Sequence, residues 1–331
     1  MKLYGKENIT AYFTSALRNE MVGHLYIFEG AVGMGKKLLA QYIASMLLCE
    51  GLQKPCHRCH HCIKADAGNH PDIIWIKEED GKALSVETAR SFVAEMHIKP
   101  FLSERKIYII PDGETLSPAV QNTLLKVFEE PPPYVTVFVT ATTRAALLKT
   151  VLSRAMVLPV NAPSLEAMTD FIREEYPAQS ENAILIATLA NGSIGQASLL
   201  SEDDTYLTMR SALYTSLTSL LGERKDIYCI LECFETYKTQ LAALLSLFSV
   251  WMRDVQFAKL SAVPKLLNYD FENEILTFSQ SIPATAAMRC YDAAMQVASH
   301  IGKGSNYTLW ITDFLLQCWR LCHDSHNRRS I

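Results

Sequence analysis

Short apolar segments alternate with amphipathic ones along the first half of the chain. Five runs rich in Val, Ile, Leu, Phe and Tyr are separated by segments in which apolar residues recur every three or four positions, the period of a helix. Strands that alternate with helices are typical of a parallel, doubly wound α/β sheet, and we expect this domain to span residues 1–160. The predicted strands lie at residues 25–28, 72–76, 106–110, 136–140 and 156–160.

After residue 160 the strand pattern ends. Residues 161–203 have the pattern of a small helical unit, and from residue 204 on long helical periodicities dominate. The sequence therefore predicts a separate all-helical domain at residues 204–331. Two pairs of cysteines four residues apart lie in it, and buried thiols in a helical core explain them better than metal ligands. The long periodicities lie at residues 206–221, 226–260, 283–301 and 307–322, and the cysteines are Cys229, Cys233, Cys318 and Cys322.

The first predicted strand runs directly into the glycine-rich turn Gly30-Ala-Val-Gly33-Met-Gly35-Lys36-Lys37, which leads into a helix. This order is typical of a phosphate loop, in which backbone N–H groups surround a phosphate and the lysine neutralises its charge. The pattern G-x-x-x-x-G-K-[ST] is met except at its last position, where Lys37 replaces the hydroxyl that would hold Mg²⁺. We expect a phosphate loop that has lost its metal ligand.

An acidic turn, Pro111-Asp112-Gly113-Glu114, follows the third predicted strand. In phosphate-loop ATPases this place supplies a carboxylate for Mg²⁺ and a glutamate that polarises water, so Asp112 and Glu114 are the candidates. A solvated turn at the end of a strand explains the same residues equally well.

A compact insert after the loop helix contains Cys49, Cys56, Cys59 and Cys62, with the spacing C-x₆-C-x₂-C-x₂-C. Four thiolates at this spacing can surround one Zn²⁺ tetrahedrally, which would close the site and make it structural. A ferredoxin-type cluster is the alternative, but Asp66 stands where its fourth cysteine belongs. The histidines of the insert, which we expect at the surface, are His57, His60 and His61.

Composition restricts the classes of function. The chain of 331 residues is 49% hydrophobic and 20% charged, with a net charge of −4, so any DNA contact must be local. No apolar run approaches a membrane span, and the first residues do not form a signal peptide. Nine cysteines without an export signal indicate a reducing compartment, so we expect a cytoplasmic protein with no membrane partner.

Further motifs carry a resemblance to a known family. A helix that starts at Ser117-Pro118 contains Asn122-Thr-Leu-Leu-Lys126-Val-Phe-Glu129-Glu130-Pro131-Pro132, and Leu152-Ser153-Arg154 precedes the last predicted strand. With the phosphate loop and the cysteine insert in this order, the chain resembles the delta-prime subunits of bacterial DNA polymerase III clamp loaders, in the AAA+ family. The resemblance implies an AAA+ domain with a zinc insert at 49–62, a helical lid at 161–203 and a helical collar at 204–331 that joins subunits.

The same resemblance implies a role for the candidate sites. Motor subunits of these loaders hydrolyse ATP, whereas delta-prime generally does not. This chain departs from the motor pattern at Lys37, at the thinned acidic turn and at Gly195, which stands where motors carry a lid arginine. We therefore expect no hydrolysis by its own ATP/Mg²⁺ site, with nucleotide binding left open. Ser153 and Arg154 match the motif that places an arginine finger in the ATP site of a neighbouring subunit.

The partners implied are the gamma/tau and delta subunits in a hetero-pentamer, the sliding clamp, and primed-template DNA held by the assembled complex. The chain would thus be a component of the DNA polymerase III holoenzyme, a DNA-directed DNA polymerase and nucleotidyltransferase. Two alternatives remain. One is an ATP-hydrolysing motor subunit of the same loader. The other is a zinc-dependent DNA-binding protein that contacts nucleic acid through basic residues of the insert, namely Lys54, Arg58 and Lys64.

Overall fold

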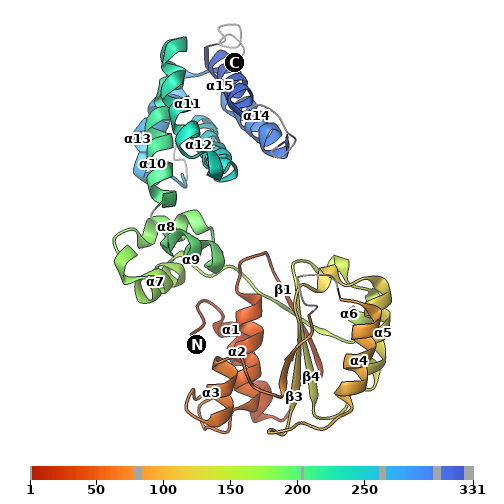
Figure 1. Ribbon diagram of the computed structural model, residues 1–331. Helices are drawn as coiled ribbons and strands as arrows, with labels where there is room; N and C mark the ends of the chain where they lie inside the picture. Colours follow the sequence, from red (N-terminus) through yellow and green to blue (C-terminus); the bar gives the residue numbers. More distant parts are fainter. Residues whose placement is uncertain (1, 78–83, 203–204, 261–265, 301–306, 324–331) are drawn as a thin grey trace. The chain divides into compact units, whose positions relative to one another are not determined.

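The computed structural model describes residues 2–77, 84–202, 205–260, 266–300 and 307–323. The chain divides into two compact units, Met1–Ser198 and Leu199–Ile331. The first contains a sheet flanked by helices, and the described part of the second is helical (Figure 1). The division into three domains at residues 160 and 203 stays a prediction.

The first unit is built on one parallel sheet with the strand order β2-β3-β4-β1-β5. The predicted parallel α/β fold is therefore confirmed. Each strand lies within one residue of its expected bounds at either end. The strands are β1 (Leu25–Glu29), β2 (Ile73–Trp75), β3 (Lys106–Ile110), β4 (Val135–Ala141) and β5 (Met156–Pro159).

Helices cover both faces of this sheet because successive side chains of a buried strand point to opposite faces. In β1, Tyr26 and Phe28 pack with the helices of one face, whereas Leu25 and Ile27 pack with those of the other. Figure 1 shows the two layers on either side of the sheet. The first layer contains α1 (Glu7–Arg18) and α2 (Lys36–Leu48), and the second contains α4 (Val86–Met96), α5 (Pro118–Glu129) and α6 (Lys149–Leu152).

Three further helices follow the sheet, and the last of them crosses into the second unit. They are α7 (Leu165–Glu175), α8 (Ala183–Ala190) and α9 (Ile194–Glu202), and α9 spans the division between the units. A short helix that the sequence analysis missed, α3 (His60–Asp66), follows the third cysteine of the insert. At seven residues it is too short to show a helical period.

The second unit packs its helices around a large apolar core that includes Phe248, Trp251 and Phe314, all buried. The expected helices are present, and α13 was missed because its first turn is polar and only Ile275 and Phe278 mark its buried side. The helices are α10 (Thr205–Leu217), α11 (Ile227–Thr236), α12 (Leu241–Leu260), α13 (Glu272–Ser281), α14 (Ala286–His300) and α15 (Tyr307–His323).

Two expectations for this unit were wrong. The periodicity over 226–260 is two helices, because Tyr237 leaves the helical conformation (φ −104°, ψ 31°) and both helices can then pack on the same core. The cysteine pairs are not all buried: Cys229 is exposed, although its partner Cys233 is buried. The C-terminal pair is buried as expected.

One segment is long and apolar enough to span a membrane by length and composition, which corrects the expectation that no run approaches that length. It is Lys238–Leu260, which comprises α12 and the turn before it. Half of its most apolar window is buried inside the helical unit, with Leu244, Phe248 and Val255 in the core. The core helix of a globular unit has the same composition, and α12 is such a helix.

Candidate functional site

The phosphate loop is held by hydrogen bonds between its own residues. Gly33 and Gly35 take positive φ angles of 81° and 77°, which only glycine adopts at little cost. Lys36, the first residue of α2, donates from Nζ to the carbonyl oxygens of Gly30 at 2.7 Å and Ala31 at 2.9 Å. Its side chain is buried, and this burial lowers the pKa of the Lys36 ammonium. The lysine is thus held by the carbonyl groups of its own loop.

The start of α9 lies directly on this loop. The backbone N–H of Gly195 donates to the carbonyl oxygen of Gly33 at 3.2 Å. A Cβ atom placed on Gly33 would lie 1.9 Å from the Oγ of Ser193, so the two segments touch where a larger residue has no room. Gly195, which the resemblance placed at the lid arginine, therefore contacts the phosphate loop through its backbone.

Lys37 and Asp112 join the loop to the acidic turn. The Nζ of Lys37 lies 2.6 Å from Oδ2 of Asp112, and both side chains are about half exposed. Asp112 follows β3 in a left-handed conformation (φ 50°), and its N–H donates to Oγ1 of Thr140 at 3.0 Å. An ammonium group therefore lies against the carboxylate that would help to hold Mg²⁺ in an ATPase. These residues do not fit a magnesium site.

The sequence analysis did not find Glu29 and Arg144, which lie beside the loop, and it did not predict the backbone contact of its candidate Glu114. Glu29, the last residue of β1, accepts from the backbone N–H and the Nε of Arg144, each at 2.8 Å. These hydrogen bonds lower the pKa of the Glu29 carboxyl. Glu114 accepts from the N–H of Thr142 at 3.2 Å, which ties the acidic turn to the end of β4. Glu29 could have been noticed beside Gly30, but nothing in the sequence marks Arg144.

Ser153 and Arg154 lie at one end of the parallel strands, and the phosphate loop lies at the other end. They come just before β5, whereas the phosphate loop follows β1, and β1 and β5 are parallel neighbours with Glu29 beside Pro159. The four residues of β5 lie between Arg154 and the end of the sheet that carries the phosphate loop, and they span roughly 13 Å at about 3.3 Å per residue. Arg154 is therefore not brought together with Lys36 and Asp112, and its guanidinium does not belong to the chain's own loop.

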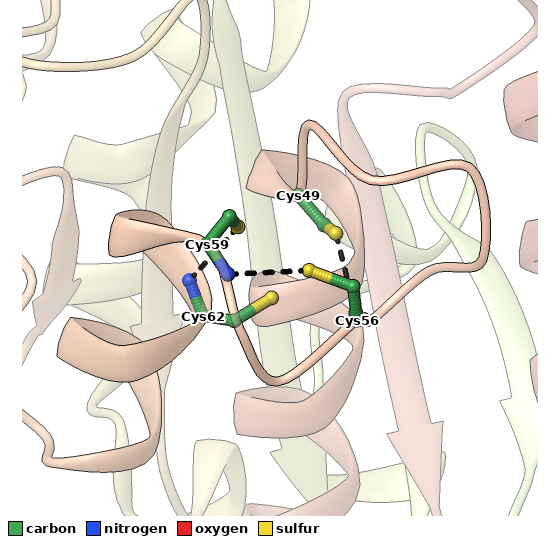
Figure 2. Close-up of side chains that lie close together, drawn as sticks. All are labelled: Cys49, Cys56, Cys59 and Cys62. Carbon is green, nitrogen blue, oxygen red and sulfur yellow. Dashed lines mark hydrogen bonds between the residues drawn. The ribbon is translucent and has the colours of Figure 1, made fainter.

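The four cysteines of the insert come together. Cys49 follows α2, Cys59 precedes α3 and Cys62 lies in its first turn. Their sulfur atoms all lie within 4.8 Å of one another, and Figure 2 shows the side chains gathered between the two helices. Backbone N–H groups donate to the sulfurs: Cys56 to Cys49 at 3.3 Å, Cys59 to Cys56 at 3.3 Å and Cys62 to Cys59 at 3.5 Å.

This donor set fits Zn²⁺. With Zn–S bonds of about 2.3 Å, a tetrahedral site separates its sulfurs by roughly 3.8 Å, so small movements would suffice. Hydrogen bonds from the backbone of Arg58 and Cys59 lower the pKa of the Cys56 thiol to about 6, whereas burial raises that of Cys49 to about 12. N–H donors of this kind favour the thiolate form that binds metal. The four-cysteine cluster could therefore bind a structural zinc ion.

The histidines of the insert differ from one another. His57 and His60 are exposed as expected, but His61 is only 3% exposed, so its placement at the surface was wrong. The N–H of Asp72 donates to Nδ1 of His70 at 3.1 Å, and Nε2 of His70 lies 2.8 Å from Nδ1 of His61. In neutral rings this chain of donors places the His61 proton on Nε2, which faces Glu50 at 3.4 Å. That nitrogen then has no lone pair for a second metal.

The basic residues of the insert are not all available to nucleic acid. The Nζ of Lys54 donates to the carbonyl oxygen of Cys49, inside the insert itself. This contact weakens the alternative of a DNA-binding zinc knuckle, since one of its three basic side chains serves the fold of the insert.

Two family descriptions match the chain in sequence. "DNA polymerase III, delta subunit" matches residues 5–164, and "DNA polymerase III, delta subunit, C terminal" matches residues 205–319. The chain belongs to the DNA polymerase III delta subunit family. It is a homologue of clamp-loader subunits, and its sheet with the helical region that follows has the predicted AAA+-like architecture.

The similar proteins include a tau/gamma subunit and a delta' subunit of DNA polymerase III. The chain is 28% identical over 233 residues to DNA polymerase III subunit tau/gamma of Haemophilus influenzae, covering 68% of this chain and 34% of that protein. It is 28% identical over 212 residues to DNA polymerase III subunit delta' of Bacillus subtilis, covering 64% and 63%. The chain thus spans about a third of the first relative and somewhat under two thirds of the second.

A solved structure is also similar. It is a DNA polymerase III gamma subunit-related protein of Thermotoga maritima, with a TM-score of 0.45 and 16% identity over 94% of this chain and 99% of that one.

Proposed function

We propose that this family member is a delta-prime subunit of a DNA polymerase III clamp loader, which takes part in loading the sliding clamp onto primed DNA. It would hydrolyse no ATP itself and would supply Arg154 to the ATP site of a neighbouring motor subunit. The observation that carries the proposal is the ion pair of Lys37 and Asp112 at 2.6 Å.

The ion pair supports an inactive site because it places a cation beside the metal position. Mg²⁺ needs oxygen ligands in a nearly ideal octahedron, and Lys37 offers none. An ammonium group at this place also repels the metal through its charge. The hydrogen bonds of Lys36 to its own loop act in the same direction, because the lysine would have to break them to bind a phosphate.

The position of Arg154 supports action in trans. The residue lies at the edge of the sheet opposite to its own phosphate loop, and its side chain is one-third exposed. A guanidinium stays charged and can bind phosphate oxygens in a planar fork. Arg154 lies far from its own phosphate loop, and its Nε and Nη2 donate no hydrogen bond within the described residues. Such an arginine could bind the phosphate of ATP held by a neighbouring subunit.

Assembly follows from the family. We infer that the chain joins gamma/tau and delta subunits in a hetero-pentamer, with the helical unit as the collar that joins subunits. The matches to a tau/gamma protein and to a delta' protein support membership of such an assembly. Contact with the clamp and with primed DNA would be made by the assembled loader. One Zn²⁺ on Cys49, Cys56, Cys59 and Cys62 would fix the insert without taking part in chemistry.

The alternative is a motor subunit with its own ATPase, which the intact Lys36 and the tau/gamma match favour. The two are separated by two measurements. Steady-state ATP turnover by the isolated chain, abolished by Lys36→Ala, would establish the motor. If the proposal holds, the isolated chain turns over no ATP, whereas Arg154→Ala in a loader reconstituted with its own partners lowers DNA-stimulated hydrolysis without preventing assembly. Wild-type hydrolysis in the assembled Arg154→Ala loader would reject the finger.

A further inference from the structure

The Arg154 guanidinium is held on one side only. Its Nη1 donates to the carbonyl oxygen of Thr150 at 2.8 Å and to Oγ of Ser153 at 3.1 Å. Its Nη2 lies 2.8 Å from Oε1 of Glu129, which comes from a different helix. Ser153 is itself fixed, because its hydroxyl donates to the same Thr150 carbonyl at 3.1 Å. Two hydrogen bonds and one ion pair thus hold the guanidinium.

The N–H groups of Arg154 that these contacts leave unused indicate what the arrangement could bind. A guanidinium has five N–H groups, two on each Nη and one on Nε. Both hydrogen bonds of the Arg154 guanidinium start at Nη1, and the contact of Nη2 with Glu129 is an ion pair. Within the described residues, neither Nε nor Nη2 of Arg154 donates a hydrogen bond. In a guanidinium, the Nε–H and one N–H of an Nη group lie side by side, and such an edge can bind a phosphate bidentately.

Helix stability does not explain Glu129. It is the last residue of α5, where the helix dipole disfavours a negative charge, and the next residue, Glu130, is acidic as well. Glu130 makes no ion pair among the residues that the structure describes, whereas Glu129 lies against Arg154. The sequence therefore keeps a carboxylate where it costs the helix some stability, and the carboxylate lies against the arginine.

We propose that Glu129 is a positioning residue for Arg154, which holds the guanidinium so that its free edge faces the phosphate of ATP in the neighbouring subunit. The inference rests on the proposed finger role of Arg154. A long arginine side chain would otherwise sample many rotamers, and each must be lost when it meets a transition state. Because the Glu129 side chain is 49% exposed, water screens its charge and the finger stays effectively cationic.

The opposite role would be a latch, in which Glu129 sequesters the arginine and must release it. The contacts favour positioning, because Nε and Nη2 donate no hydrogen bond within the described residues while the ion pair is intact. The two roles differ in the sign of the effect: removal of a positioning residue slows hydrolysis, whereas removal of a latch speeds it.

The test uses the loader reconstituted from this full chain and its partner subunits, with clamp and primed DNA. Glu129→Ala should lower the kcat of DNA-stimulated hydrolysis by about half or more of the loss that Arg154→Ala causes, with KM for ATP unchanged. Glu129→Gln keeps an acceptor oxygen and should recover most of the rate. Glu130→Ala is the matched control at the adjacent exposed position and should behave as wild type. Loss of Glu129 relieves the helix dipole, so it should not unfold α5.

The double variant Glu129→Ala/Arg154→Ala decides whether the two residues act together. If Glu129 acts through the arginine, the double variant is no slower than Arg154→Ala alone. An additional loss in the double variant, or a Glu129→Ala rate equal to or above wild type, overturns the inference while leaving the finger standing. If Arg154→Ala itself is without effect in the assembled loader, the proposed function fails and the positioning role fails with it.

Discussion

At the scale of single residues, both lysines of the phosphate loop are bonded to groups of the chain itself. Lys36 makes its hydrogen bonds to carbonyl oxygens that lie five and six positions back in the chain, and Lys37 makes an ion pair with Asp112. The motif predicted the loop and the loss of a metal ligand. It did not predict these partners, because they depend on how closely β1, β3 and α9 approach in space.

Gly33 should not tolerate a side chain because Ser193 lies against it. Gly33→Ala would place its Cβ against Ser193 and hold alanine at φ 81°, so we expect a loss of unfolding free energy of at least about 1–2 kcal/mol, the cost of the left-handed conformation alone. Gly68→Ala is the control, since Gly68 has a φ of 70° with nothing within 4 Å. Chemical denaturation of the two variants gives the difference. Equal losses would show that the contact with Ser193 contributes nothing.

Lys37→Thr should not create an ATPase. The threonine restores the hydroxyl of the loop motif, but Gly195 still stands at the lid position and the start of α9 still lies on Gly33. Steady-state ATP turnover by the isolated variant is the measurement, with Lys36→Ala/Lys37→Thr as the control for contaminating activity. Turnover that requires Lys36 would mean that residue 37 alone inactivates the wild-type chain.

At the scale of elements, the sequence predicted strands and capped helices well. It did not predict where one helix ends and the next begins, as at Tyr237. The strands were found within one residue because they are apolar on both faces, and α5 was bounded by Ser117, whose Oγ accepts from the N–H of Val120, and by Pro131. The break at Tyr237 carries no proline or glycine, so only packing on the shared core reveals it. The buried place of His61 likewise depends on His70, nine residues away.

The cysteine insert should lose its order with its metal. Cys59→Ser should remove about one equivalent of zinc per chain, and cleavage by protease should increase within residues 49–62, because the unfolded insert has no preformed site. Cys229→Ser, at an exposed cysteine of the helical unit, is the matched control and should keep its zinc. Elemental analysis of freshly purified protein checks the first claim. Iron, or less than half an equivalent of zinc, would refute the assignment.

At the scale of the whole molecule, two compact units are joined within α9. The helical unit has its own core, so it should fold without the sheet. We expect a fragment of residues 205–331 to give a helical circular dichroism spectrum with a cooperative thermal transition. A spectrum rich in β-structure, or a transition without cooperativity, would contradict this.

The bonds that close the phosphate loop have a thermodynamic consequence. A protein whose site is completed by a ligand gains stability with ligand concentration, by RT ln(1 + [L]/Kd). Here the carbonyl oxygens of Gly30 and Ala31 accept the hydrogen bonds of Lys36 that a phosphate would otherwise accept. The thermal midpoint of the purified chain should therefore stay constant as Mg²⁺-ATP is raised from zero to millimolar concentrations, whereas a clear rise would reveal an open and competent site. In a cell, such a subunit would keep the same stability at every energy charge, and its structure would be independent of the nucleotide that its neighbours consume.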